Sequence, residues 1–286
     1  MADDLIRTGF INSALFSLSI MFCVVTMCLF PLTLSANECP EIPPVPVATE
    51  ADRQFALEWK GVAKPYSVFE WMGGAELAPL GTGHLALVNP SANYYDWAKK
   101  VSLPLWNAPG KAFYGWLHSA LILPLDQPAA AALTGAGMVE TDLDHYNLVA
   151  LQQLETGWIQ IQLLPGRNGA KWTHRCHLGL GESALRYQSW DAFLIKQGGW
   201  LKLRTGIGDN LLQEPTESAQ SAGMLSPDEV FSLVAMKDDW ILIQVRPCRE
   251  SEIETGKQAI SGWIKWSAPF LGPRVWPAQG QCQKQP

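Results

Sequence analysis

An internal repeat constrains the fold of this chain more than any other feature of its sequence. Residues 157–163 read GWIQIQL, and residues 239–245 read DWILIQV. A second tryptophan segment follows each copy, AKW at residues 170–172 and SGW at residues 261–263. Because an internal repeat fixes architecture before any single motif does, the sequence predicts a duplicated structural module.

Shorter matches extend the repeat, pairing GWLH at residues 115–118 with GWLK at residues 199–202. They predict tandem modules near residues 95–180 and 185–270, with loop insertions between fixed strands. Residues 53–94 are predicted to be an N-terminal β extension or a small extra module, and residues 271–286 a C-terminal tail.

The composition favours an all-β globular protein and argues against nucleic-acid binding. Twenty prolines and 24 glycines separate short apolar runs along the 286 residues, and many brief strands with regular turn signals predict all-β architecture. The net charge is −6, and no run of Lys or Arg exceeds two residues. Because a nucleic-acid surface needs a basic stripe to neutralise phosphates, we expect no nucleic-acid partner.

The N-terminal region predicts export. Residues 10–34 are uncharged and mostly apolar, so residues 1–36 are predicted to be a signal peptide or a membrane anchor. Small residues at Ser35 and Ala36 favour cleavage. The protein is then periplasmic or secreted, with membrane contact only through residues 10–34 if they are not cleaved. Residues 37–52 read as a proline-rich linker.

Cysteine usage agrees with export. Four cysteines lie outside the apolar N-terminal segment, which suggests two disulfide bonds in an oxidising compartment. The three connectivities cannot be distinguished from the sequence, and free buried thiols are the alternative. The candidates are Cys39, Cys176, Cys248 and Cys282.

Strand phase predicts where the repeated tryptophans point. Because side chains alternate between the two faces of a strand, Ile159 and Ile161 share one face, and Ile241 and Ile243 share its counterpart. These are the predicted core faces. The tryptophan that begins each strand has the opposite phase, so it points towards a groove, a neighbouring module or solvent.

A tryptophan strand, a turn and then Gly-Trp-aliphatic resemble the bacterial SH3 family of small β-barrels found in exported proteins. The match is best over residues 240–263 and fair over residues 158–172, where Lys171 and Thr173 depart from the pattern. The resemblance implies an all-β fold with two tandem SH3-like barrels after the N-terminal segment.

In SH3-like barrels an acidic loop lies near the tryptophan face, and the resemblance implies the same pairing here for residues 140–146 and 226–231. Carboxylates beside aromatic rings suit a cationic or proline-rich peptide, whereas a solvated loop without a specific role is the alternative. The predicted ligand-binding residues are Asp142, Asp144, Tyr146, Trp158, Trp172, Asp228, Glu229, Trp240 and Trp263.

No motif predicts catalysis. His174 and Cys176 have the strand spacing of two metal ligands, but without a second His/Cys cluster we favour a disulfide at Cys176 beside surface histidines. We expect no enzyme activity, no metal and no cofactor.

The sequence therefore favours a non-catalytic binding protein of the cell envelope that recognises a peptide, a protein partner or peptidoglycan. An accessory subunit of a cell-wall hydrolase and a purely structural envelope protein are the alternatives.

Overall fold

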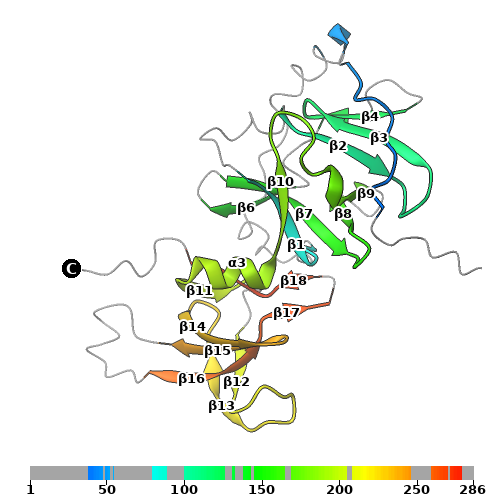
Figure 1. Ribbon diagram of the computed structural model, residues 1–286. Coiled ribbons are helices and arrows are strands. Elements are labelled where there is room, and N and C mark those ends of the chain that lie inside the picture. The colour runs from blue at the N-terminus through cyan, green and yellow to red at the C-terminus, as the bar shows by residue number, and fades with distance from the viewer. Residues whose placement is uncertain are drawn as a thin grey trace, which may run out of the picture. The chain divides into compact units, whose positions relative to one another are not determined.

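A computed structural model describes residues 38–47, 49–51, 54, 79–88, 100–125, 131–132, 138–142, 145–164, 169–204, 208–245, 259–269 and 271–278. Residues from Cys39 onward form one compact unit. Its regular structure is almost entirely antiparallel β, as predicted (Figure 1). The predicted signal or anchor segment, Asp144, Cys248 and Cys282 lie outside the described residues. In the described part of the chain, no helix is long and apolar enough to cross a membrane.

The first sheet has ten strands in the order β10-β1-β7-β8-β9-β2-β3-β4-β5, and β6 pairs with β7. Its strands are β1 (Gly83–Leu87), β2 (Ser102–Trp106), β3 (Phe113–His118), β4 (Leu121–Pro124), β5 (Ala131–Ala132), β6 (Met138–Asp142), β7 (His145–Gln153), β8 (Trp158–Gln162), β9 (Ala170–His174) and β10 (Leu185–Ser189). A 3-10 turn, η5 (Arg175–His177), follows β9.

The second sheet has seven strands in the order β13-β12-β16-β15-β14-β11-β19. Its strands are β11 (Trp200–Leu203), β12 (Asp209–Leu212), β13 (Ser221–Leu225), β14 (Val230–Lys237), β15 (Trp240–Val245), β16 (Ile260–Lys265) and β19 (Val275–Pro277). The short strands β17 (Ser267–Ala268) and β18 (Gly272–Pro273) pair separately.

Strand pairing shows that the sequence repeat is a repeat of topology. Within β7-β8-β9, Trp158 lies opposite His174, and within β14-β15-β16, Trp240 lies opposite Lys265. A register shift follows Ala150 in β7, and its counterpart in β14 lies between Leu233 and Ala235. The two three-stranded units therefore share register as well as order.

The correspondence covers seven strands in each copy. In both copies the first strand, β1 or β11, pairs with the first strand of the three-stranded unit and with the last strand of the copy. In both copies a hairpin also pairs with the third strand of the unit: β2 of the β2–β3 hairpin pairs with β9, and β12 of the β12–β13 hairpin pairs with β16. We call β1, β2, β3, β7, β8, β9 and β10 the first module, and β11, β12, β13, β14, β15, β16 and β19 the second module.

This pairing changes the predicted alignment and boundaries. The counterpart of β11, with its GWLK sequence, is β1 rather than β3. The predicted extension at residues 53–94 contributes β1 to the first module, and β10 belongs there although it falls within residues 185–270. In the second module, β19 lies in the predicted tail. Among the described residues no strand pair closes either sheet into a barrel, so SH3-like barrels remain a prediction.

The core lies where strand phase predicted it. Ile159, Ile161, Ile241 and Ile243 are completely buried. Two large apolar clusters result, one inside the first module and one that joins the second module to Leu80 and to other first-module residues. Burial of the alternate aliphatic side chains is the main stabilising term of each sheet.

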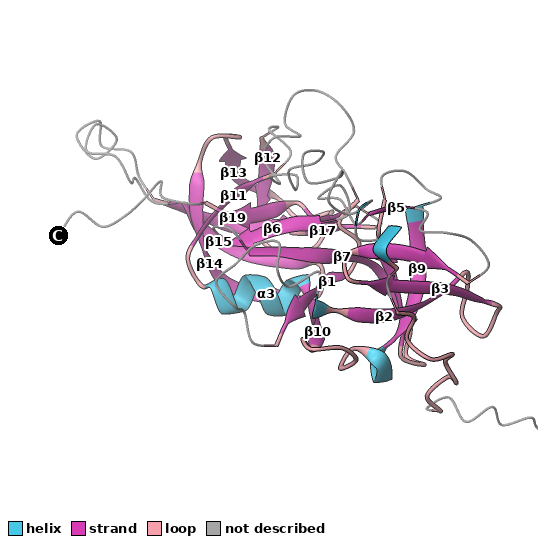
Figure 2. Cartoon of the chain, turned by 90° about the horizontal axis from the view of Figure 1, so that it is seen from above, coloured by secondary structure: helices cyan, strands magenta, loops and turns pink. Residues whose placement is uncertain are grey.

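A helix that the sequence did not predict packs into the second cluster. Helix α3 (Trp190–Gln197) begins after Ser189 and ends at Gly198, whose φ of 53° is left-handed. It is the one long helix among the described residues (Figure 2). The Trp190 indole N–H donates to the Leu80 carbonyl at 2.8 Å, and the Leu80 N–H donates to the Leu271 carbonyl at 3.1 Å. These bonds tie the start of the first module to α3 and to the connection between β17 and β18.

His84 on β1 is buried in this junction. Its ring lies 4.6 Å from that of Trp190 and 5.4 Å from that of Phe193, centroid to centroid. Burial, together with the smaller effect of the positive charge of Arg186, lowers its pKa from 6.5 to about 3. Its Nδ1 has no hydrogen-bond partner among the described residues. The imidazole is therefore neutral at pH 7.

Equivalent glycines in the two hairpins provide a matched test of the fold. Gly115 and Gly223 adopt φ values of 154° and 153° beside equivalent register shifts. A Cβ on Gly115 would lie 2.1 Å from the Leu123 carbonyl oxygen, whereas one on Gly223 would meet only side-chain atoms at 3.7 Å or more. We expect Gly115→Ala to lower the free energy of unfolding by about 3 kcal/mol or more and Gly223→Ala by about 1 kcal/mol. Chemical denaturation of both variants measures this, and equal losses would contradict the described packing of β3 on β4.

His84 predicts a component of acid sensitivity. Because its folded pKa is lower than its unfolded pKa, unfolding takes up a proton below pH 6.5. The corresponding stability is complete above pH 6.5 and is lost as the pH falls towards 3, by about 1.4 kcal/mol per pH unit. His84→Phe should flatten the pH profile of unfolding free energy between pH 6 and 4. Parallel profiles for the variant and the parent would show that His84 is not buried in its neutral form.

Candidate functional site

The outer face of the first module is covered by its own aromatic side chains. Trp158 is 9% exposed, and its ring meets those of Trp106 at 5.1 Å and His174 at 5.2 Å, both edge to face. Phe113 and His177 pack against Trp106 from other directions. Trp158 therefore points away from the aliphatic core, as strand phase predicted, but it offers little surface to a ligand.

A disulfide ties the N-terminal segment to this aromatic cluster. Cys39 is bonded to Cys176 on η5, across 137 residues of sequence, and Ile42 packs against a small apolar cluster around Trp116. The disulfide predicted at Cys176 is confirmed. The adjacent histidines are not on the surface, however, because His174 and His177 are only 2% and 5% exposed.

The second module presents its outer face differently. Leu212, Trp263, Leu242 and Ala235 lie directly opposite one another across β12, β16, β15 and β14. Directly opposed residues of antiparallel strands point to the same face, so these four form an apolar row. Trp240 lies beside this row on β15, and it is half-buried, as are Trp263 and Leu242.

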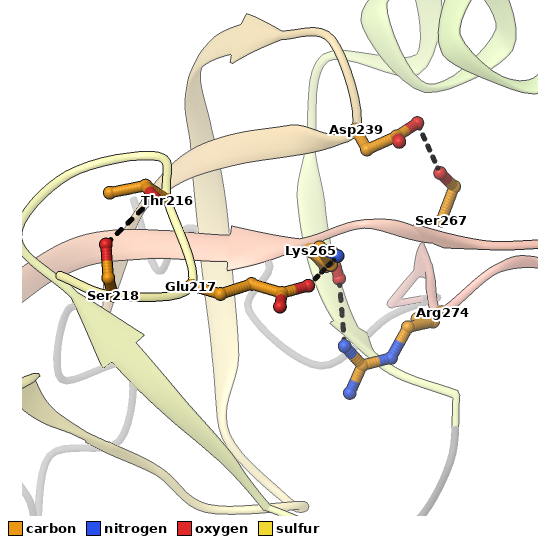
Figure 3. Close-up of polar contacts among 7 residues, drawn as sticks. All are labelled: Thr216, Glu217, Ser218, Asp239, Lys265, Ser267 and Arg274. Atoms are coloured by element: carbon orange, nitrogen blue, oxygen red, sulfur yellow. Dashed lines mark hydrogen bonds and ion pairs between the residues drawn. The ribbon is translucent and has the colours of Figure 1, made fainter. Parts of the chain in front are cut away.

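Charged groups border the row. The Lys265 ammonium lies 5.5 Å from the centre of the Trp240 ring and bonds to the Glu217 carboxylate. Glu217 lies in the loop between β12 and β13, so its ion pair with Lys265 attaches this loop to β16 (Figure 3). Exposed Lys237 lies opposite Trp240 on the other side. Leu212, Ala235, Lys237, Trp240, Leu242, Trp263 and Lys265 together are the aromatic face.

Hydrogen bonds and an ion pair next to the aromatic face fix the end of β16 and the β14–β15 turn. The Arg274 guanidinium donates to the Lys265 carbonyl at 3.3 Å and forms an ion pair with Asp209 at 2.8 Å. The Ser267 hydroxyl bonds to the Asp239 carboxylate at 3.1 Å (Figure 3). The segment that follows β16 and the β14–β15 turn are therefore fixed to each other, which holds Trp240 at the start of β15 in place.

The predicted acidic loops do not lie beside the tryptophans. Asp228 and Glu229 precede β14, whereas Trp240 pairs with Lys237 at its other end. The eight residues of β14 separate the two ends by roughly 20 Å. Asp228 is exposed, and the Glu229 carboxylate accepts a hydrogen bond from the Ser226 N–H at 2.6 Å, which closes a turn.

The first module has the same arrangement. Asp142 ends β6 opposite His145 at the start of β7, whereas Trp158 follows the far end of β7. Tyr146 is half-buried next to the β6–β7 turn, and Trp172 is half-buried opposite Gln160. The Asp142 side chain lies outside the described residues. The predicted pairing of acidic loops with tryptophans is therefore wrong, because a loop before a strand and a turn after it lie at opposite ends.

The charged residues in and beside the aromatic face, Lys237, Lys265 and Glu217, were not predicted from the sequence. Alternation along β16 could have identified Lys265, which is two residues after Trp263 and so shares its face. Glu217 could not have been found in this way, because its ion pair joins a loop to a strand 48 residues away.

Comparison with known proteins identifies no family for this chain. No family model matches it, and the comparison with curated proteins found no match. The structures of NlpC2 and NlpC1 from Trichomonas vaginalis align with TM-scores of 0.24 and 0.23, both at 10% sequence identity. The alignments cover 72% and 65% of this chain. The chain spans about half the length of these two structures, 51% and 47%.

Proposed function

We propose that this chain is an exported, non-catalytic binding protein of the cell envelope that uses the aromatic face of the second module. The half-buried pair Trp240 and Trp263 carries this proposal, because Trp158, the counterpart of Trp240 in the first module, is covered by Trp106 and His174. The disulfide between Cys39 and Cys176 is typical of an oxidising, exported compartment.

The aromatic face has an apolar centre and a polar border of both charges. Flat indole rings offer large, rigid contact area. Lys237 and Lys265 supply hydrogen-bond donors at the border, and Glu217 supplies acceptors. A ligand with apolar ring faces and many hydroxyl, amide and carboxylate groups suits such a surface. Peptidoglycan has this chemistry, so we propose it as the ligand in place of the cationic peptide that the acidic loops suggested.

The other two functions remain alternatives. An accessory role in cell-wall hydrolysis needs the same binding face and a separate catalytic partner. A purely structural role is favoured in the first module by the burial of Trp158 within its own cluster. It is less favoured in the second module, where Trp240 retains exposed surface.

Co-sedimentation with purified peptidoglycan tests the proposal. The parent chain should sediment with the polymer, and the double variant Trp240→Ala/Trp263→Ala should lose binding by at least tenfold. Ile195→Ala on α3 is the matched control, because Ile195 is an apolar side chain 57% exposed outside the aromatic face. It should bind like the parent.

Near-UV circular dichroism of each variant should show a folded chain. If the double variant is folded and binds like the parent, the proposed face is wrong. Absence of binding by the parent, with binding to a peptide or protein partner instead, would replace the proposed ligand. Clearing of peptidoglycan in a zymogram by the purified chain would contradict the non-catalytic assignment.

A further inference from the structure

Two cysteines and two histidines meet on the first module, although they are distant in sequence. Cys39, Cys176 and His177 each place a potential ligand atom within 4.8 Å of the other two. His174 adds a fourth group, because its Nδ1 lies 2.9 Å from the Cys176 sulfur. In the sequence only His174 and Cys176 have the spacing of two metal ligands. The fold brings Cys39 and His177 next to them.

Both imidazoles are oriented as metal ligands usually are. The Nε2 of His174 lies 2.9 Å from the Thr156 carbonyl oxygen, and the Nε2 of His177 lies 2.9 Å from the Pro40 carbonyl oxygen. A carbonyl only accepts, so each Nε2 carries the proton and each Nδ1 keeps its lone pair. The lone pair of His174 accepts a hydrogen bond from the Cys176 N–H at 3.5 Å, which a bound metal ion would replace. Metal-bound histidines characteristically donate their second ring N–H to such a group.

The distances approach those of a tetrahedral site. Zn–S bonds of about 2.3 Å and Zn–N bonds of about 2.0 Å place sulfur and nitrogen about 3.5 Å apart across a tetrahedron. The Cys39 sulfur lies 3.7 Å from Nδ1 of His177 and 3.5 Å from its Nε2, so the imidazole must turn to direct Nδ1 at an ion bound to this sulfur. In a tetrahedral site the Cys176 sulfur and Nδ1 of His174 would lie roughly half an ångström farther apart than they do here. The Cα atoms of the cysteines are 5.9 Å apart, so one ion can reach both sulfurs.

We propose that the reduced chain binds one Zn²⁺ ion through Cys39, Cys176, His174 and His177. In the oxidised chain the same sulfurs form the disulfide, so the disulfide and the zinc site exclude each other. The four ligands match the Cys2His2 set of structural zinc sites. Bound zinc would keep the N-terminal segment attached to η5 when the covalent link is broken.

The redox step needs a dithiol reductant. It transfers two electrons and two protons to the disulfide, which breaks the S–S bond, yields two thiols and converts the reductant to a disulfide. Zn²⁺ then displaces both protons and binds two thiolates. Access is open, because Cys39 and Cys176 are exposed while His177 is buried beside them. An exposed disulfide is of the kind that reductants reach.

Zinc titration of the full chain carrying Cys23→Ser, Cys28→Ser, Cys248→Ser and Cys282→Ser tests this inference. A phosphine reductant leaves no competing thiol in solution. We expect one equivalent of zinc to bind in competition with a chromophoric chelator, and none after reoxidation. Co²⁺ should give the absorption of a tetrahedral thiolate site. Zinc should also raise the melting temperature of the reduced chain and leave that of the oxidised chain unchanged.

Single substitutions assign the ligands. In the same background, His177→Gln should weaken zinc binding on the order of 100-fold, and His174→Gln at least tenfold. His118→Gln is the matched control, because His118 bonds to Ser102 away from the cluster. The proposal is wrong if the oxidised chain binds zinc equally, if both histidine variants bind like the parent, or if the reduced chain binds no zinc. A melting temperature of the reduced chain that zinc does not raise would also overturn it.

Discussion

The alternation of side chains along β8 and β15 is the constraint on which the rest of the structure depends. On one side of each strand, isoleucines are completely buried and hold the sheet against its core. The other side is then fixed as an outer face, with Trp158 or Trp240 at its start. A one-residue shift of register would exchange the two faces. The equivalent register shifts in β7 and β14 show that both copies keep the same register.

The two outer faces have diverged from this common geometry. In the first module, Trp106 and the buried histidines cover Trp158, and the disulfide attaches the N-terminal segment to η5. In the second module the position of His174 is occupied by Lys265, which extends over Trp240 rather than burying it. The two copies therefore share a topology but differ in the surface that they present, and the proposed function uses only that of the second module.

The sequence predicted the features that depend on local periodicity. The all-β class, the duplication and the buried isoleucines follow from alternation and self-similarity, which a single strand already shows. The partner strand of GWLK could not be predicted in this way, because pairing of β11 with β14 and β19 is decided by long-range contacts. Helix α3 was missed because its apolar residues are not segregated to one face. Trp190 and Phe193 are buried by aromatic contacts with His84 and Trp276, which come from the first and the second module respectively.

The same distinction explains the candidate sites. The tryptophans are evident in the sequence, but their exposure depends on neighbours such as Trp106, which is 52 positions before Trp158. The proximity of Cys39 to His177 likewise arises only from the fold. The acidic loops were assigned to the wrong end of their strands, since sequence distance does not reveal which strand end a loop shares with a distant turn.

The most direct test of the account is ¹⁹F NMR of the chain labelled with fluorotryptophan, titrated with soluble peptidoglycan fragments. Trp→Phe variants assign the resonances. The account predicts that the signals of Trp240 and Trp263 shift with increasing ligand, whereas those of Trp106 and Trp158 stay unchanged. Shifts confined to Trp106 and Trp158, or no shift at Trp240 and Trp263 under conditions where the fragments bind, would contradict it.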